Sequence, residues 1–164
     1  MRSQLLALTC LAGLLACQPA GGALTDADRT TIADEVTRID TEFWDAWMAM
    51  DIPLGMSFYR GTPDPVWAWN GEVRSGLENL RTWFTEALRG VHHQTITFAD
   101  RKVTVLDRDV VYVMEQGSFV GFDTAGTQLG SGQFAVSVVW VRSDGGWKVA
   151  GGHESIRPPE PGAT

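Results

Sequence analysis

The chain has 164 residues, 44% hydrophobic and 20% charged, and it is long enough to bury a single hydrophobic core. Its formal net charge of −7 and its pI near 4.8 argue against proteins that bind nucleic acid by neutralising phosphates. Seven tryptophans favour either an aromatic core or an aromatic ligand pocket, and the composition leaves both open.

The N-terminal residues 1–16 have the features of an export signal. Arg2 supplies a positive charge, and the apolar run 5–16 has about 12 residues, fewer than the ~20 of a membrane-spanning helix. The sequence LLAC at 14–17 resembles the lipobox of bacterial lipoproteins, in which the cysteine is acylated and becomes the first mature residue. This resemblance implies lipidation of Cys17; an ordinary secretory signal cut near residues 20–23 is the alternative.

Cysteine usage agrees with an anchor rather than a disulfide framework. Cys10 lies inside the signal, and no cysteine follows Cys17. Residues 17–24 are rich in Pro, Gly and Ala and predict a flexible tether. Gln18, and not an aspartate, follows the cysteine. This resembles the pattern of Gram-negative lipoproteins that are sent to the outer membrane. We therefore expect an exported chain, lipid-anchored in the bacterial envelope at the outer membrane facing the periplasm, with membrane contact through the anchor only.

Three helices are predicted in the first half of the domain. Thr25 begins a long amphipathic helix that ends near Asp51, and residues 51–60 predict a short second helix. A third helix begins at Ser75 as a possible cap and ends at Gly90. Apolar residues of the first helix recur at helical spacing, and we expect its charged residues mostly away from that face: Glu35, Arg38, Asp40, Glu42 and Asp45.

Strands occupy the rest of the domain. Asn70-Gly71 predicts a hairpin turn between residues 66–69 and 72–74. Four β-rich runs then follow without another helix, at 94–106, 110–122, 129–142 and 147–156. The last is preceded by a tight Asp-Gly-Gly turn. Helices followed by a four-stranded meander predict an α+β fold with a sheet curved around the helices, and no internal repeat is evident.

Alternation places several residues of the last strand on one face: Trp147, Val149, Gly151, His153 and Ser155. That face is apolar at its start and polar at its end. Because Gly151 has no side chain, we expect this strand to lead from the core into a cavity beside His153. The tail, residues 158–164, is rich in proline and is expected to be disordered.

Four local patterns, in this order, resemble the SnoaL-like branch of the nuclear transport factor 2-like superfamily: the long first helix, Pro65-Val66-Trp67, GLENL at 76–80, and the run from Trp140 to Ser155. The resemblance covers roughly residues 28–155 and implies a SnoaL-like domain over 25–157. It implies a cone-shaped α+β barrel that encloses a pocket and is commonly a homodimer through its sheet. Members include isomerases, dehydratases, cyclases and non-catalytic binding domains, so the fold leaves the function open.

Candidate chemistry comes from a few residues. Enzymes of this superfamily use an Asp, Glu or His in the pocket, which points to His153 and Glu115 as an acid/base pair. Many SnoaL-like sequences carry two histidines on the last strand; here the first of those positions is Gly151, which weakens a histidine-pair mechanism. His153 as a hydrogen-bonded residue of the cone and Glu115 facing solvent or a dimer interface are the alternatives. His92-His93 lack a third ligand at metal spacing, and no phosphate loop or nucleophile elbow occurs, so no metal or cofactor is expected.

Three functions are therefore carried forward. The first is an envelope-anchored domain that binds a small apolar or aromatic molecule in its cone, with this expected lining: Trp47, Phe58, Tyr59, Trp67, Trp69, Phe84 and His153. The second is an isomerase, dehydratase or cyclase that uses His153 and Glu115. The third is a homodimeric assembly domain that works through its sheet face. Nucleic acid is not an expected partner.

Overall fold

The computed structural model describes residues 23–159; the predicted signal, Cys17, most of the tether and residues 160–164 lie outside them. The helices are α1 (Asp26–Met48), α2 (Ile52–Ser57) and α3 (Leu77–Ala87). The strands are β1 (Val66–Trp69), β2 (Glu72–Ser75), β3 (His93–Asp107), β4 (Val110–Phe122), β5 (Gln128–Ser143) and β6 (Gly146–Arg157). Within the described range, no helix is both long and apolar enough to span a bilayer.

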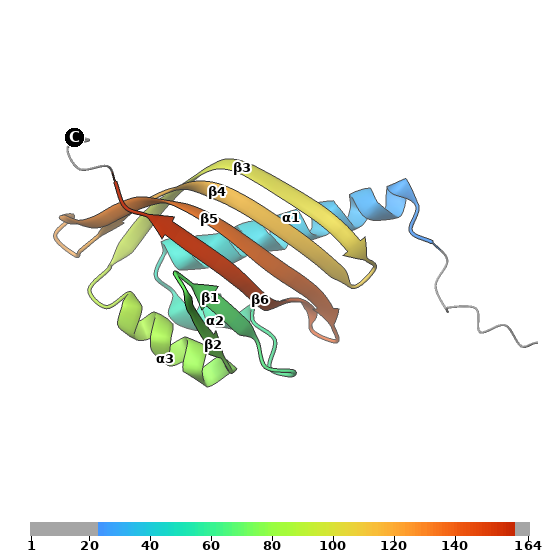
Figure 1. Cartoon of the computed structure of the whole chain (residues 1–164), viewed down its shortest axis with the longest axis horizontal. Helices are drawn as coiled ribbons and strands as arrows, with labels where there is room; N and C mark the ends of the chain where they lie inside the picture. Colours follow the sequence, from blue (N-terminus) through green and yellow to red (C-terminus); the bar gives the residue numbers. More distant parts are fainter. Residues whose placement is uncertain (1–22, 160–164) are drawn as a thin grey trace, which may run out of the picture.

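The strands form one open, curved sheet in the order β2-β1-β6-β5-β4-β3. Strands β3 to β6 make the predicted antiparallel meander, whereas β1 joins its edge by parallel pairing with β6. Figure 1 shows β3–β6 arching over α1, with α2 and α3 beside the β1–β2 hairpin. The predicted α+β fold, with a curved sheet packed against N-terminal helices, is confirmed.

Local sequence explains where the elements begin and turn. Thr25 caps α1 in a reciprocal capping box with Asp28. Asn70 and Gly71 both have positive φ, which suits the two-residue turn between β1 and β2. The predicted cap of the third helix was wrong: its N-cap is Gly76, at φ 90°, and no side chain caps the helix. Glycine adopts this positive φ without the steric penalty that a serine would meet at position 76.

The buried face of α1 contains one charged residue that the sequence placed elsewhere. Ile32, Val36, Phe43 and Trp47 pack under the sheet as their spacing predicts. Asp40 was expected away from this face but is 0% exposed. It lies four residues after Val36 and three before Phe43, so helical geometry places it on the same stripe, where its charge requires compensation from the sheet.

Two β-bulges change which side chains face the helices. On β3 the register with β4 shifts between Phe98 and Asp100, so Ala99 is an extra residue and Arg101 turns inward. On β6 the register with β5 shifts so that Val149 pairs with Trp140 and Gly151 pairs with Val139. The extra residue there is Ala150. Because side chains alternate along a strand, one inserted residue moves all later side chains to the opposite face.

Candidate ligand-binding pocket

An apolar pocket of about 310 Å³ lies between the concave face of the sheet and the helices. Its lining residues come from α1, α3 and every strand except β2, together with Tyr59 and the segment that follows α3. Half of the lining residues are aromatic: Phe43, Trp44, Trp47, Tyr59, Trp67, Trp69, Trp83, Phe84, Phe119 and Phe134. The polar side chains among the residues that line it are those of Gln94, Glu154 and Tyr59, with the indole N–H groups.

The rings near the β1 side form a continuous series of contacts. Trp69 and Trp83 lie 5.5 Å apart between ring centroids, and Trp83 lies 4.6 Å from Phe84. Phe84 is 6.2 Å from both Trp67 and Tyr59, which are themselves 6.0 Å apart. Edge-to-face and tilted pairs at these distances add packing energy beyond buried area and hold the rings in place. We call these five residues the aromatic cage.

Glycine at position 152 allows the cage to approach β6. A Cβ atom there would lie 2.4 Å from the Trp67 ring and 2.6 Å from the carbonyl oxygen of Ser137. Gly152 and Trp67 are direct partners in the parallel pairing of β1 with β6. The Trp67 indole therefore occupies the space that the side chain of any other residue at position 152 would fill. Glycine at this position lets β6 pass directly behind the ring.

Glu154 is the carboxylate of the pocket. The bulge at Ala150 places Gly152, Glu154 and Ile156 on the inner face, and Glu154 and Ile156 both line the cavity. Burial among apolar groups raises the pKa of Glu154 to about 7. Its surface is only partly removed from solvent, because the side chain borders an open cavity, while protein atoms surround it on the other sides. At neutral pH such a carboxyl exchanges a proton readily.

Two further polar groups of the wall have no partner within residues 23–159. The hydroxyl of Tyr59 and the indole N–H of Trp67 are buried without a hydrogen bond, and their side chains are 4% and 3% exposed. Burial, with a smaller contribution from the negative charge of Glu154, holds the pKa of Tyr59 well above its usual range. Buried donors without a partner are unusual in folded proteins, and here two of them lie in residues of the pocket wall.

The predicted lining residues mostly meet at this pocket. Trp47, Tyr59, Trp67, Trp69 and Phe84 all line it. Phe58 does not: it packs edge-to-face on Phe43 and Trp140, behind the wall. Trp83, on α3, lines the pocket but is not among the predicted lining residues.

His153 is placed differently from its expected position. It is exposed, pairs with Ala68 and Ser137 across the sheet, and is absent from the pocket wall. Strict alternation from Trp147 placed it inside, and the extra residue at Ala150 reverses that alternation. The structure thus brings Glu154, the residue that sequence reasoning missed, to the position expected for His153. Paired glycines at 151–152 were the available signal, since glycine within a strand often marks a bulge.

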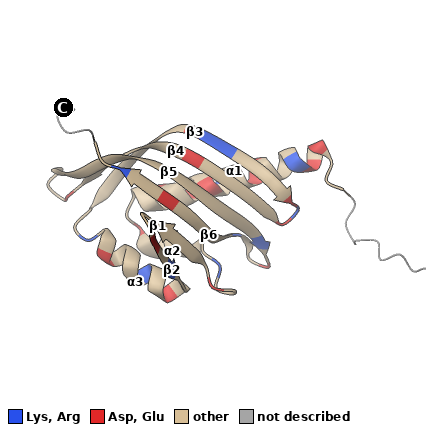
Figure 2. Ribbon diagram, in the orientation of Figure 1, with Lys and Arg blue, Asp and Glu red and all other residues tan. Residues whose placement is uncertain are grey.

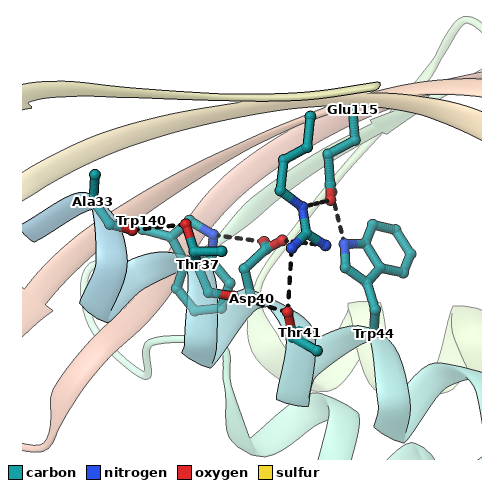
Figure 3. A network of polar contacts seen from close by, with 8 residues as sticks. Ala33, Thr37, Asp40, Thr41, Trp44, Glu115 and Trp140 are labelled. Carbon is teal, nitrogen blue, oxygen red and sulfur yellow. Dashed lines mark hydrogen bonds and ion pairs between the residues drawn. The ribbon is translucent and has the colours of Figure 1, made fainter. Parts of the chain in front are cut away.

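Glu115 is inward but belongs to a separate buried cluster. It is 2% exposed, and it accepts hydrogen bonds from Trp44 Nε1 at 2.7 Å and Arg101 Nε at 2.5 Å. Arg101 also lies 3.3 Å from Asp40, and Trp140 donates a hydrogen bond to Asp40 (Figure 3). Burial, and then the nearby charge of Glu115, raise the pKa of Asp40 to about 7, against the opposing effect of Arg101. The predicted pair of His153 and Glu115 is therefore not brought together.

The described residues offer no cluster of three or more His, Cys, Asp or Glu side chains suited to a metal ion. His92 and His93 approach each other through their Nδ1 atoms at 3.5 Å, and His93 stacks on Phe122 with centroids 4.9 Å apart. Two nitrogens without a third ligand do not make a typical protein metal site.

Comparison with known proteins agrees with the fold. Residues 36–159 match the family model of the SnoaL-like domain. Among curated proteins, none matches the chain. A nuclear transport factor 2-like superfamily protein from Salmonella enterica is similar, with a TM-score of 0.68, 16% identity, and coverage of 82% of this chain and 96% of that one.

Two other similar structures carry names that refer to different functions, one to association and one to isomerisation. The association domain of C. elegans CaMKII has a TM-score of 0.63 and 18% identity, covering 80% of this chain and 99% of that one. A ketosteroid isomerase-like protein from Erwinia carotovora atroseptica has a TM-score of 0.62 and 16% identity, covering 79% and 96%. At these identities the structural likeness establishes a shared fold. The family match, by contrast, spans most of the sequence, and the chain belongs to the SnoaL-like domain family.

Proposed function

We propose that this protein binds a small, largely apolar molecule of one or two rings in the pocket beneath its sheet. One observation carries the proposal: the aromatic residues surround an open cavity of about 310 Å³ instead of filling it. This volume lies at the lower end of the range for small-molecule sites, which are mostly apolar with a few polar groups. Glu154, Tyr59 and Trp67 would orient the ligand.

Titration with 2-naphthol, a neutral two-ring probe, tests the proposal. We expect saturable 1:1 binding by isothermal titration calorimetry, with quenching of tryptophan fluorescence. The matched variant is Gly130→Leu, because Gly130 lines the pocket and a Cβ there meets nothing within 4 Å. The added side chain has room to enter the pocket and should weaken binding at least about tenfold. Absence of saturable binding, or equal binding by Gly130→Leu, would contradict the proposal.

A second candidate function is proton transfer to or from the bound molecule by Glu154. It is favoured by a carboxyl whose pKa of about 7 suits both acid and base roles at neutral pH, within an apolar cavity. The test is turnover of keto–enol or double-bond isomerisation substrates. Glu154→Gln should lower kcat by at least about a hundredfold while His153→Ala leaves it unchanged. Turnover that survives Glu154→Gln would remove this candidate.

We infer that the domain works in the bacterial envelope, tethered through Cys17, on the strength of the apolar run and the LLAC sequence before it. We also infer a homodimer, because α1, α2 and α3 gather on one side and leave the opposite face of β3–β6 uncovered (Figure 1). Exposed Met114 lies on β4 in this part of the sheet. Light scattering of the chain at several concentrations tests the dimer, and a constant monomer mass would contradict it.

A further inference from the structure

Glu154 sits within the part of the pocket that is richest in aromatic rings. It is the direct partner of Trp69 in the β1–β6 pairing, and Trp69 continues into the ring contacts of the aromatic cage. Its charge acts on Tyr59, another member of the cage. The cavity therefore combines one carboxylate with several π-faces. The face of an aromatic ring carries negative electrostatic potential and attracts cations, most strongly for tryptophan.

Glu154 also differs from the other buried carboxylates in having no counter-ion among the residues that the structure describes. Asp40 and Glu115 share Arg101, at 3.3 Å and 2.5 Å. Within residues 23–159, the side chain of Glu154 makes neither an ion pair nor a hydrogen bond that would compensate its charge. A buried carboxylate is costly unless it is paired. The fold supplies a cation for one buried acidic site and leaves the other open toward a cavity.

The surrounding charges do not supply that cation. The residues that line the pocket include no Lys, Arg, His or Asp, and their titratable members are Glu154 and Tyr59. Arg74, outside the wall, is paired with Glu72 and lies 5.2 Å from the Trp83 ring centroid. This contact shows that a ring of the cage already accepts a cation. The net charge of −7 adds a general attraction for cations, and Figure 2 shows acidic residues on both helices and strands.

We propose that the pocket takes an organic cation, a quaternary or alkylated ammonium group on an apolar body, with the ammonium group against the aromatic cage and charge-paired with Glu154. This inference rests on the proposed binding function and specifies the class of ligand. The methyl groups of such a cation would contact the rings, where a strongly hydrated primary ammonium fits less well. The apolar remainder would extend toward Ile96, Phe119 and Phe134.

The proposal has a pH dependence of defined sign. Burial raises the pKa of Glu154 to about 7, and the carboxylate form is the one that pairs with a cation. A quaternary ammonium does not titrate, so a change in its affinity with pH reports a change in the protonation of the protein. Affinity should fall about tenfold between pH 8 and pH 6 as Glu154 becomes protonated. Tyr59 stays protonated throughout this range, because its pKa is raised.

Choline and 3,3-dimethyl-1-butanol provide a matched pair of probes, since they share one shape and differ by the charge at a single atom. Isothermal titration calorimetry of the full chain at pH 8 and constant ionic strength should show choline binding at least about tenfold more tightly than the alcohol. In Glu154→Gln this preference should shrink to about threefold or less. Glu78→Gln, which removes the same charge from the exposed surface of α3, should keep it.

The outcomes separate this inference from the binding function on which it rests. If 2-naphthol binds 1:1 but choline binds no better than its neutral isostere, the binding function stands and the cation proposal is overturned. The proposal is also overturned if the preference for choline persists in Glu154→Gln, because another group would then hold the cation. If none of the three probes binds, both fail.

Discussion

Trp69 on β1 and Glu154 on β6 are direct neighbours in the parallel strand pairing of the described sheet, and both line the pocket. The residue beside Glu154, His153, pairs with Ala68 and is exposed. One inserted residue, Ala150, determines which of the two faces the cavity. The chemistry available in the pocket is therefore that of a carboxyl group among indoles.

The first prediction concerns stability against pH. The pKa of Glu154 is raised from 4.5 to about 7 by burial, so the folded protein retains a proton that the unfolded chain releases. Stability then falls as pH rises from about 4.5 to 7 and levels off above 7. Glu154→Gln should remove this loss and be about 1–3 kcal/mol more stable than the parent at pH 8. Urea unfolding at several pH values measures the effect.

Asp40 has a raised pKa of the same sign, so the Glu154→Gln variant should keep part of the pH dependence. Glu78→Gln is the control, since it removes an exposed carboxylate and should leave the pH profile as in the parent. A Glu154→Gln profile that coincides with that of the parent between pH 5 and 8 would show that Glu154 titrates as an ordinary surface carboxyl.

The second prediction concerns His153. Because its side chain is exposed on the face of β6 away from the pocket, His153→Ala should change the affinity for 2-naphthol less than about twofold and stability by less than about 0.5 kcal/mol. Calorimetry and urea unfolding check both values. A loss of pocket binding on this substitution would restore the original expectation for His153 and would contradict the placement of the β6 bulge.

The elements of this fold were largely predictable from sequence because their signals are local. Helical spacing of apolar residues on α1, the Asn70-Gly71 turn and the glycine-bounded β-rich runs each depend on near neighbours along the chain. Part of the aromatic lining could also be predicted from the sequence, since five predicted lining residues meet at the pocket. What remained open from sequence was whether the rings fill the cavity or enclose it.

The polar residues of the interior were harder to predict, because their placement depends on register. The bulges at Ala99 and Ala150 arise from pairing with neighbouring strands, and no local pattern fixes the inserted position. Arg101 and Glu154 face inward only as a result of these insertions. Asp40 was predicted to face away from the core, because its partner Arg101 lies 61 positions further along the chain, on β3, where β3 contacts α1.

The third prediction compares Gly152, which lies against the Trp67 ring, with Gly130 of the pocket wall. A Cβ at Gly152 would overlap the Trp67 ring at 2.4 Å and a carbonyl oxygen at 2.6 Å, so Gly152→Ala should destabilise the fold by about 2–4 kcal/mol. Gly130→Ala is the matched control, because nothing lies within 4 Å of the added atom; we expect a change of less than about 1 kcal/mol. Equal stability of the two variants in urea unfolding would show that β1 and β6 can move apart around the added methyl group without loss of stability, which would contradict the prediction.

The fourth prediction concerns the proposed anchor. Cys17→Ser should move the protein from the membrane fraction to the soluble fraction and abolish palmitate incorporation, because the lipid requires the cysteine at the processing site. Cys10→Ser is the control: it changes a cysteine within the predicted signal and should leave both unchanged. Membrane association that survives Cys17→Ser, or a parent chain that incorporates no lipid, would favour the ordinary secretory signal.

The fifth prediction concerns the buried cluster in which Arg101 of β3 pairs with Asp40 of α1 and Glu115 of β4. Asp40 and Glu115 are 0% and 2% exposed, so Arg101→Met would leave two buried carboxylates without their shared cation. Breaking a buried pair in this way costs about 3–5 kcal/mol, more than the pair itself contributes. We therefore expect a strong loss of stability at pH 8 in urea unfolding.

The same variant should recover part of its stability at pH 5. The pKa of Asp40 is already raised to about 7 with Arg101 present, and removal of the guanidinium raises it further, so acid neutralises the uncompensated charge. Lys102→Met controls for the loss of a positive charge on β3, since Lys102 is exposed and lies 3.9 Å from Asp100; it should cost less than about 0.5 kcal/mol at either pH. If Arg101→Met lost no more stability than Lys102→Met at pH 8, the cluster would not hold α1 to the sheet, and Asp40 would have to be protonated or hydrated without help from Arg101.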